Sequence, residues 1–137
     1  MTNFKYDILQ IVLLTLVLIF INNTVHANNI KNSAVVYMYH KFDTQKYPST
    51  NITLEQFEAH LLEFKKKKYT ILSLDYIIDI IINDGELPDN TVGISVDDAD
   101  RSFLTTAWPR FKEMGFPVTL FVSTSTIIKG NKNYLNW

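Results

Sequence analysis

Two adjacent carboxylates, Asp97 and Asp98, come directly after a short apolar run and are the residues of this sequence best placed to do chemistry. Neighbouring carboxylates repel each other, so both stay ionised only where a cation or hydrogen bonds hold them. Such a pair suits a site in which one acid binds a metal ion and the other takes a proton from metal-bound water. The alternative is two solvated loop acids, with Asp100 or Ser102 capping the next helix, because turns favour Asp for ordinary structural reasons.

The residues around this pair predict a strand before it and a helix after it. The run 92–96 is rich in β-branched residues and follows a turn at Pro88, which predicts a buried strand. The periodic segment 103–114 predicts a helix that is kinked or broken at Pro109. The two acids would then lie at the carboxyl end of a strand, which is where open α/β folds bind their ligands.

Upstream of the pair, the segment 34–40 predicts a first strand that is nearly all apolar and therefore buried on both faces. His40 ends this strand, at the same edge of the sheet as Asp97 if the two strands are parallel. A lone His in such a place is more often a structural residue than a ligand. A capping box that begins at Thr53 opens an amphipathic helix. His60 lies off the apolar stripe of that helix, which predicts a solvated side chain.

The other segments continue an alternation of strands and helices, which indicates the α/β class. A short strand is predicted over 69–72 and a helix over 74–83, with a core stripe formed mainly by its isoleucines. Gly115 suits the left-handed residue that closes a helix. A third apolar strand is predicted over 118–122 and a mostly polar loop over 123–133.

Length and composition indicate one small domain and exclude several classes of site. The chain has 137 residues, a formal net charge of −1 and 47% hydrophobic residues. This length suits a single domain, and the near-zero charge gives no support for a nucleic-acid partner. The chain has no cysteine, so disulfides, a catalytic thiol and a cysteine metal site are all excluded.

The amino-terminal segment 1–27 predicts a secretory signal peptide, cleaved before Asn28, and hence a secreted, periplasmic or cell-envelope location. Its apolar core, 8–21, is shorter than the roughly 20 residues that span a bilayer. An uncleaved anchor is the alternative, and it would be the only predicted contact with a membrane. We expect a flexible amino terminus over 28–33 and one domain over 34–137.

Four segments, in order, resemble the polysaccharide deacetylase family, also called the NodB-homology or carbohydrate esterase family 4 domain. The segment 94–99, Ile-Ser-Val-Asp-Asp-Ala, resembles the first motif of the family, Thr-Phe-Asp-Asp-Gly. The segment 36–40 resembles the "MYH" strand of the family, and 72–75 resembles the segment before its second helix. The segment 112–122 resembles its helix-to-strand passage. The likeness extends over the predicted domain.

The resemblance implies the front part of a distorted (β/α) barrel that hydrolyses N-acetyl groups on an N-acetylated amino-sugar polymer. It also implies that Asp97 is the catalytic base and that Asp98 binds a divalent metal, zinc above all. Ala99 stands where the motif has glycine, which costs energy if that position needs a positive φ. In the family two metal-binding histidines follow this motif, whereas the histidines of this sequence all precede it: His26, His40 and His60.

Three functional hypotheses therefore stay open. The first is a metal-dependent polysaccharide deacetylase. The second is a non-catalytic remnant, or one half of a split deacetylase domain with a complementary fragment as its partner, because a barrel cut midway exposes strand edges and apolar faces. The third is a phosphatase of the haloacid dehalogenase type, since the segment 98–100 is a D-x-D after a strand, although no phosphate-binding loop accompanies it.

Overall fold

The structure is a computed structural model, and it describes residues 32–66 and 68–137. The predicted signal peptide and residues 28–31 lie outside the described residues, so the signal peptide and the flexible amino terminus stay predictions. Within the described part, no helix is both long enough and apolar enough to cross a bilayer.

Four parallel strands make up the main sheet of the described residues. β1 (Ala34–Tyr39) and β5 (Thr91–Val96) pair along their whole length. On the other side of β5, β4 (Thr70–Ile71) pairs with its first residues and β6 (Thr119–Leu120) with its last. The first and central strands are therefore parallel, as the α/β class predicted for this chain implies, and β5 lies at the centre of the sheet.

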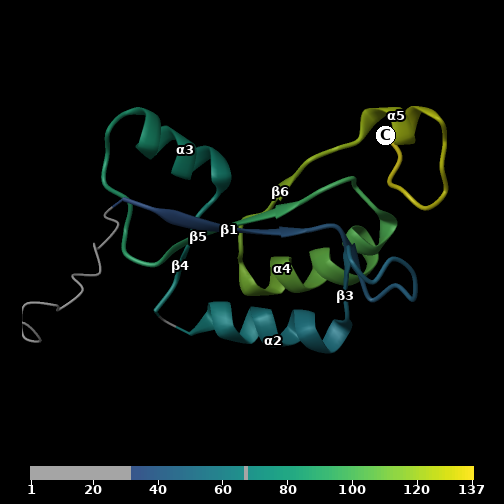
Figure 1. Ribbon diagram of the computed structural model, residues 1–137, viewed down its shortest axis with the longest axis horizontal. Coiled ribbons are helices and arrows are strands. Elements are labelled where there is room, and N and C mark those ends of the chain that lie inside the picture. Colours follow the sequence, from purple (N-terminus) through teal and green to yellow (C-terminus); the bar gives the residue numbers. More distant parts are fainter. Residues whose placement is uncertain (1–31, 67) are drawn as a thin grey trace, which may run out of the picture. The chain divides into compact units, whose positions relative to one another are not determined.

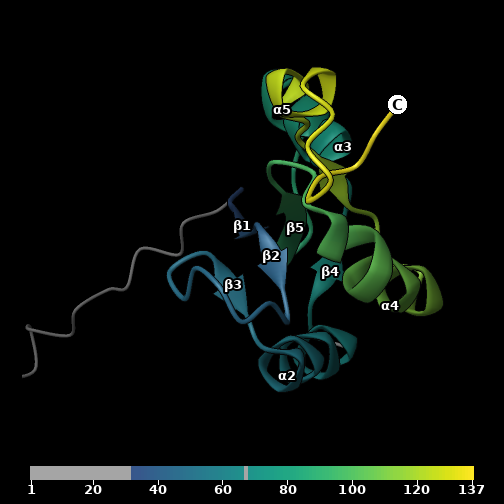
Figure 2. The ribbon, with the colours of Figure 1, turned by 90° about the vertical axis from the view of Figure 1, so that its right-hand side faces the viewer.

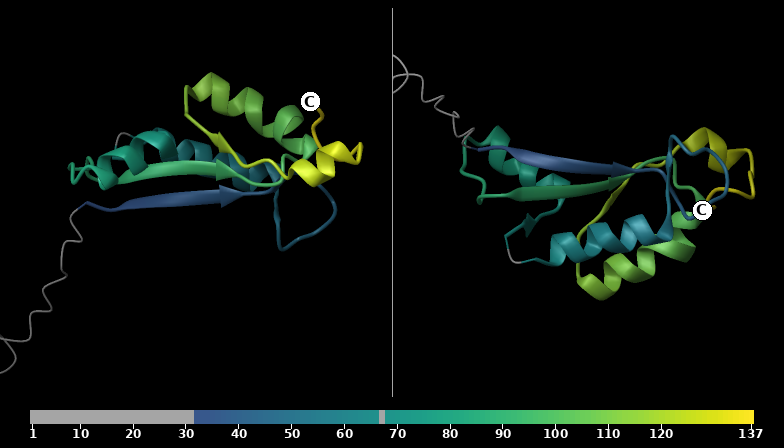
Figure 3. Two further views of the ribbon diagram at one scale, coloured as in Figure 1. Left: turned by 90° about the horizontal axis from the view of Figure 1, so that it is seen from above. Right: turned by 60° about the horizontal axis from the view of Figure 1, so that its bottom comes forward.

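Helices cover both faces of this sheet. They are α2 (Leu54–Lys65), α3 (Leu74–Ile82) and α4 (Trp108–Met114). The described residues also form the π-helical turn η1 (Phe103–Ala107) and the short helix α5 (Thr124–Ile128), which follow β5 and β6 in the sequence. Figure 1 shows the sheet nearly edge-on, with α3 on one face and α2 and α4 on the other. Figure 3 shows α2 and α4 running side by side along that second face.

The alternation of side chains along β5 explains the two layers. Val92, Ile94 and Val96 point to the face of α2 and α4 and belong to the buried core cluster. The rings of Phe57 in α2 and Phe111 in α4 meet edge to face at a centroid distance of 5.1 Å, which joins the two helices over the strand. These residues are nearly inaccessible to solvent, so this side of the sheet holds the main core.

The opposite face of β5 admits α3 because it carries a glycine. A β-carbon at Gly93 would lie 2.5 Å from Leu74 Cδ2 and 3.1 Å from Ile77 Cδ1. A larger residue would therefore force the side chain of Leu74 to move, since the first contact is well inside van der Waals distance.

The predicted helix signals are confirmed. Thr53 and Gln56 make both hydrogen bonds of the capping box at the start of α2. The predicted break at Pro109 is a change of helix type, from the π-helical turn η1 to α4. Proline lacks the N–H that an α-helix needs at this point, which accounts for the change. Gly115 closes α4 with φ of 67°, in the left-handed region.

The prediction that the first strand is buried on both faces is wrong. Four consecutive apolar residues of β1 are between 39% and 61% exposed, namely Val35, Val36, Tyr37 and Met38. Among the described residues β1 pairs with β5 alone, so its other edge carries no strand. An apolar composition therefore identified the strand but not its surroundings.

Two smaller predictions also need correction. In α3 only Ile77 is buried, whereas Ile78 and Ile81 are about half exposed, so the predicted core stripe is narrower than the sequence indicates. The predicted loop 123–133 contains the short helix α5, which buries Ile127. A short ladder of β2 (Lys41–Phe42) and β3 (Asn51–Ile52) also lies between β1 and α2 in the sequence.

Candidate active site

Asp97 and Asp98 follow the last residue of β5, as predicted, and lie at the edge where β1 also ends. Figure 2 is turned so that this edge of the sheet faces the viewer. Both side chains are partly accessible to solvent, whereas all six residues of β5 are buried. The strand therefore fixes the backbone and leaves the two carboxylates at the surface, as a site for a dissolved ligand requires.

The register of β1 against β5 brings His40 to Asp97. Tyr39 pairs with Val96, so the next residue of each strand, His40 and Asp97, projects to the opposite face from the main core. The Asp97 N–H donates to the Tyr39 carbonyl at 2.8 Å, which extends the ladder by one step. His40 Nε2 lies 3.9 Å from Asp97 Oδ2, and the two side chains are 25% and 30% exposed. Because the two strands are parallel, His40 and Asp97 lie at the same edge of the sheet, as the sequence analysis expected for that arrangement.

The chain turns sharply after Asp97 through two left-handed residues. Asp98 has φ of 69° and Ala99 has φ of 57°. Left-handed backbone is costly for a residue with a β-carbon, and such strain is concentrated at functional sites. The glycine position of the motif thus has a positive φ in this chain, so the cost that the sequence made conditional on such a φ applies to Ala99.

A distant segment of the chain pins this turn. The Leu135 N–H donates to the Ala99 carbonyl at 2.9 Å, and the Arg101 N–H donates to the Asn133 carbonyl at 2.8 Å. Between these bonds, Asp100 and Tyr134 form an antiparallel bridge. Sequence reasoning missed this contact, since it ended the predicted polar loop at residue 133, assigned no structure to 134–135, and no local signal marks such pairing.

Asp100 is buried, and its hydrogen bonds give its side chain a structural role. Its Oδ1 accepts from the Ser102 N–H at 2.9 Å and from the Ser102 hydroxyl at 2.6 Å. The Ser102 Oγ in turn accepts from the Phe42 N–H at 3.0 Å, which joins β2 to the start of η1. The structural interpretation, an acid that caps the following helix, therefore holds for Asp100. The D-x-D pattern of a phosphatase gains no support from it.

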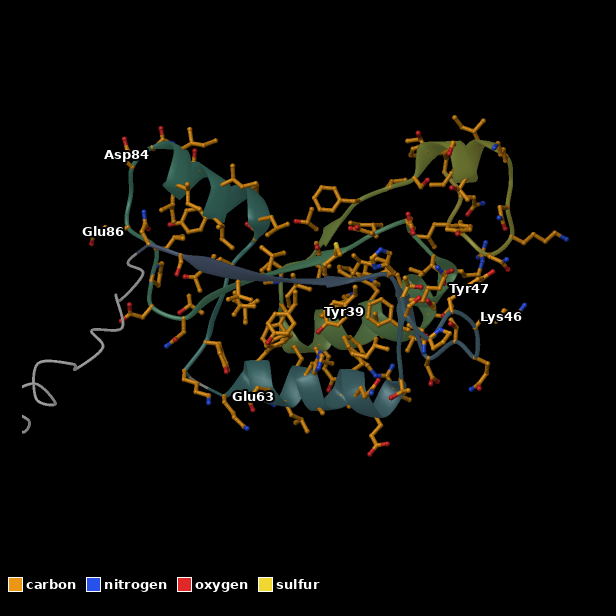
Figure 4. All side chains as sticks on the ribbon, in the orientation of Figure 1. Tyr39, Lys46, Tyr47, Glu63, Asp84 and Glu86 are labelled. Carbon is orange, nitrogen blue, oxygen red and sulfur yellow. The ribbon has the colours of Figure 1, made fainter. Side chains whose placement is uncertain are left out.

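Behind the site, Tyr39 and His60 form a pair that the sequence did not predict. The Tyr39 hydroxyl lies 2.9 Å from His60 Nδ1, and His60 also contacts the rings of Tyr37 and Phe64. His60 is half-buried, so the prediction of a solvated side chain is wrong. Burial, together with the nearby Tyr37, raises the pKa of Tyr39 well above its usual range, so the phenol stays protonated. Figure 4 labels Tyr39 between the sheet and α2.

The donors in the described part of the chain do not complete a metal site. Catalytic zinc usually has three protein ligands. In residues 32–66 and 68–137, no three His, Asp or Glu side chains gather closely enough to hold a metal ion. Asp98 and its neighbours Asp97 and His40 could supply one or two ligands, so the remainder would have to come from elsewhere.

No protein-family profile and no curated protein matches this sequence, but several solved structures do. The Streptococcus pyogenes deacetylase PplD in complex with acetate has a TM-score of 0.66 and 21% identity. That match covers 78% of this chain and 49% of PplD. The polysaccharide deacetylase BC0361 from Bacillus cereus has a TM-score of 0.61 and 18% identity, over 77% of this chain and 34% of that one.

A de-N-acetylase from Aggregatibacter actinomycetemcomitans also matches, with a TM-score of 0.61 and 22% identity, over 69% of this chain and 39% of that one. The chain thus spans half or less of the length of these structures. At such identities the likeness concerns the fold. The described residues have the fold of part of a polysaccharide deacetylase, or NodB-homology, domain, as the sequence motifs predicted.

Proposed function

We propose that this chain forms the front part of a metal-dependent deacetylase that hydrolyses N-acetyl groups on an amino-sugar polymer. The observation that carries the proposal is the position of Asp97 and Asp98 at the carboxyl end of β5, beside His40, in a fold shared with polysaccharide deacetylases. The predicted signal peptide supports a secreted or cell-envelope location, and no feature supports a nucleic-acid partner.

Asp97 is the proposed general base. As a water oxygen attacks the carbonyl carbon of the N-acetyl group, Asp97 takes a proton from that water. The bond between the carbonyl carbon and the sugar nitrogen then breaks, acetate leaves, and the nitrogen is protonated to an amine. His40 Nε2 lies 3.9 Å from Asp97 Oδ2, beyond hydrogen-bond distance, so it would have to move closer to orient this carboxylate.

Asp98 is the proposed metal ligand of this chain, with zinc as the expected ion. Bound zinc would supply Lewis-acid polarisation of the carbonyl group. The described residues do not make up the usual three zinc ligands. We therefore expect the chain to need a complementary fragment of the domain for a complete site.

The experiment measures acetate release from an N-acetylglucosamine polymer with added zinc. The chain is tested alone and together with the half of PplD that it does not match. We expect release only in the mixture, and Asp97→Asn should lower it at least about 100-fold, the lower range for loss of a general base. Asp89→Asn, in an exposed turn far from β5's carboxyl end, is the matched control. If the mixture releases acetate equally well with Asp97→Asn, the assignment of Asp97 as the general base is refuted.

A second candidate is a non-catalytic chain that only binds a complementary fragment. The exposed run Val35–Met38 on the unpaired edge of β1 favours it, because an apolar edge strand readily accepts another strand. This candidate predicts a stable complex with the other half in size-exclusion chromatography but no acetate release. If the chain elutes as a stable monomer and forms no complex with the other half of the domain, this candidate is contradicted.

A further inference from the structure

A polar pocket of about 460 Å³ lies beside the candidate active site. Three segments line it, and they are 41–47, 100–106 and 131–134. The first begins directly after His40, and the second begins two residues after Asp98, so the pocket adjoins the edge that carries the two acids. Figure 4 labels Lys46 and Tyr47 at this end of the molecule.

The pocket has a surplus of positive charge. Four basic residues line it, Lys41, Lys46, Arg101 and Lys132, against two acidic ones, Asp43 and Asp100. Asp100 is buried, and its Oδ1 accepts two hydrogen bonds from Ser102. The surplus of two positive charges favours an anionic ligand.

The basic residues divide into a fixed pair and a free pair. Arg101 is fixed, because its Nε donates to the Lys132 carbonyl at 2.9 Å and its Nη2 to the Tyr134 carbonyl at 3.0 Å. Lys41 Nζ lies 5.0 Å from the centre of the Tyr47 ring. Lys46 and Lys132 form no ion pair with any residue of 32–66 or 68–137, so both ammonium groups can meet a ligand.

Tyr47 gives the pocket an aromatic wall. It is 62% exposed, yet its backbone is left-handed, with φ of 61°. That conformation is strained for a bulky residue, and burial of the ring does not compensate it. The Thr50 N–H donates to the Tyr47 carbonyl at 3.0 Å and holds the residue in place. An exposed ring held in this way can lie against the apolar face of a ligand, as aromatic residues of binding pockets do.

We propose that this pocket binds a sugar unit that carries an anionic group, either a phosphate or a carboxylate. The ring of Tyr47 would contact the sugar face, Lys46 and Lys132 would meet the anionic group, and the hydroxyl and amide side chains of 105–106 and 131–133 would bond the sugar hydroxyls. The choice of a sugar rests on the proposed function, whereas the anionic group follows from the charges of the pocket.

The test is calorimetric titration of the full chain without metal, at low ionic strength. The probes are N-acetylglucosamine 6-phosphate, glucuronic acid, N-acetylglucosamine and inorganic phosphate. We expect one of the two anionic sugars to bind more tightly than both the neutral sugar and phosphate, and the stronger of the two identifies the anionic group. Raising the salt concentration should weaken this binding, because exposed charges are screened.

Variants assign the contacts. The double substitution Lys46→Gln with Lys132→Gln should weaken binding of the anionic sugar about fivefold, the effect of losing two partly exposed charge contacts. Tyr47→Ala should weaken this binding as well. Lys112→Gln, an exposed lysine of α4 outside the pocket, should change nothing. These titrations contain no metal and follow binding alone, so the failure of catalysis and the failure of this pocket give different results.

Three outcomes would overturn the proposal. The first is that no probe binds although the circular dichroism spectrum shows a folded chain, and the second is that inorganic phosphate binds as tightly as the anionic sugars. The third is that Lys112→Gln weakens binding of the anionic sugar as much as the double lysine substitution does.

Discussion

The left-handed backbone of Ala99 predicts that two alanines of equal burial respond differently to glycine. Ala99 and Ala107 are both fully buried. Ala99 has φ of 57°, whereas Ala107 has φ of −85° and ψ of −47°, in the right-handed helical region. Ala→Gly at either position removes one buried methyl group and makes the unfolded chain more flexible. A comparison of the two substitutions therefore isolates the backbone conformation at residue 99.

The expected magnitudes follow from these conformations. At Ala107 the lost methyl group costs about 0.8 kcal/mol and glycine in a helix about 1 kcal/mol, so the free energy of unfolding should fall by about 2 kcal/mol. At Ala99 the methyl loss and the added chain flexibility are offset by about 1–2 kcal/mol of left-handed strain that glycine releases. The net change there should be close to zero.

Urea denaturation followed by circular dichroism measures both changes, and equal m values would show that the unfolded states are comparable. We expect Ala99→Gly to be more stable than Ala107→Gly by about 2 kcal/mol. Equal losses at the two positions would refute the reasoning, because the turn that carries Asp98 would then hold no backbone strain.

Three further predictions concern other parts of the chain. Thr53→Ala removes the capping box of α2 and should cost about 1 kcal/mol in the same urea assay. Hydrogen bonding to Lys66 lowers the pKa of Glu63 below its ordinary 4.5, so Glu63→Gln should reduce thermal stability above that pH, and the difference should vanish as the pH falls through the lowered pKa. Lysine at both Val36 and Met38 should reduce self-association in light scattering and change stability by less than about 0.5 kcal/mol.

Features set by local chemistry could be predicted from the sequence. The capping box at Thr53, the helix change at Pro109 and the left-handed Gly115 depend on a few neighbouring residues, and each is confirmed. The position of Asp97 and Asp98 after a buried strand is also confirmed, because the β-branched run and its abrupt end are visible in one short stretch. The roles of these two acids in chemistry stay predictions.

Features set by tertiary contacts could not be predicted in this way. The composition of β1 is that of a buried strand, but exposure depends on which strands and helices lie beside it, and β1 pairs with β5 alone among the described residues. The pairing of Asp100 with Tyr134 joins residues 34 positions apart without any sequence signal. His60 lies off the apolar stripe of α2, yet Tyr37 and Tyr39 reach it from the sheet.

The aromatic residues of β1 explain why the candidate site forms where it does. A shift of one residue in the pairing of two strands turns every side chain to the opposite face. Tyr37 packs on Phe64 at 4.8 Å between ring centres, and Tyr39 contacts Phe57, so both rings hold one face of β1 against α2. With both rings packed on this face and Tyr39 buried, His40 projects to the other face, where the next residue after β5 is Asp97. The core on one side of the sheet therefore determines which side chains meet on the other.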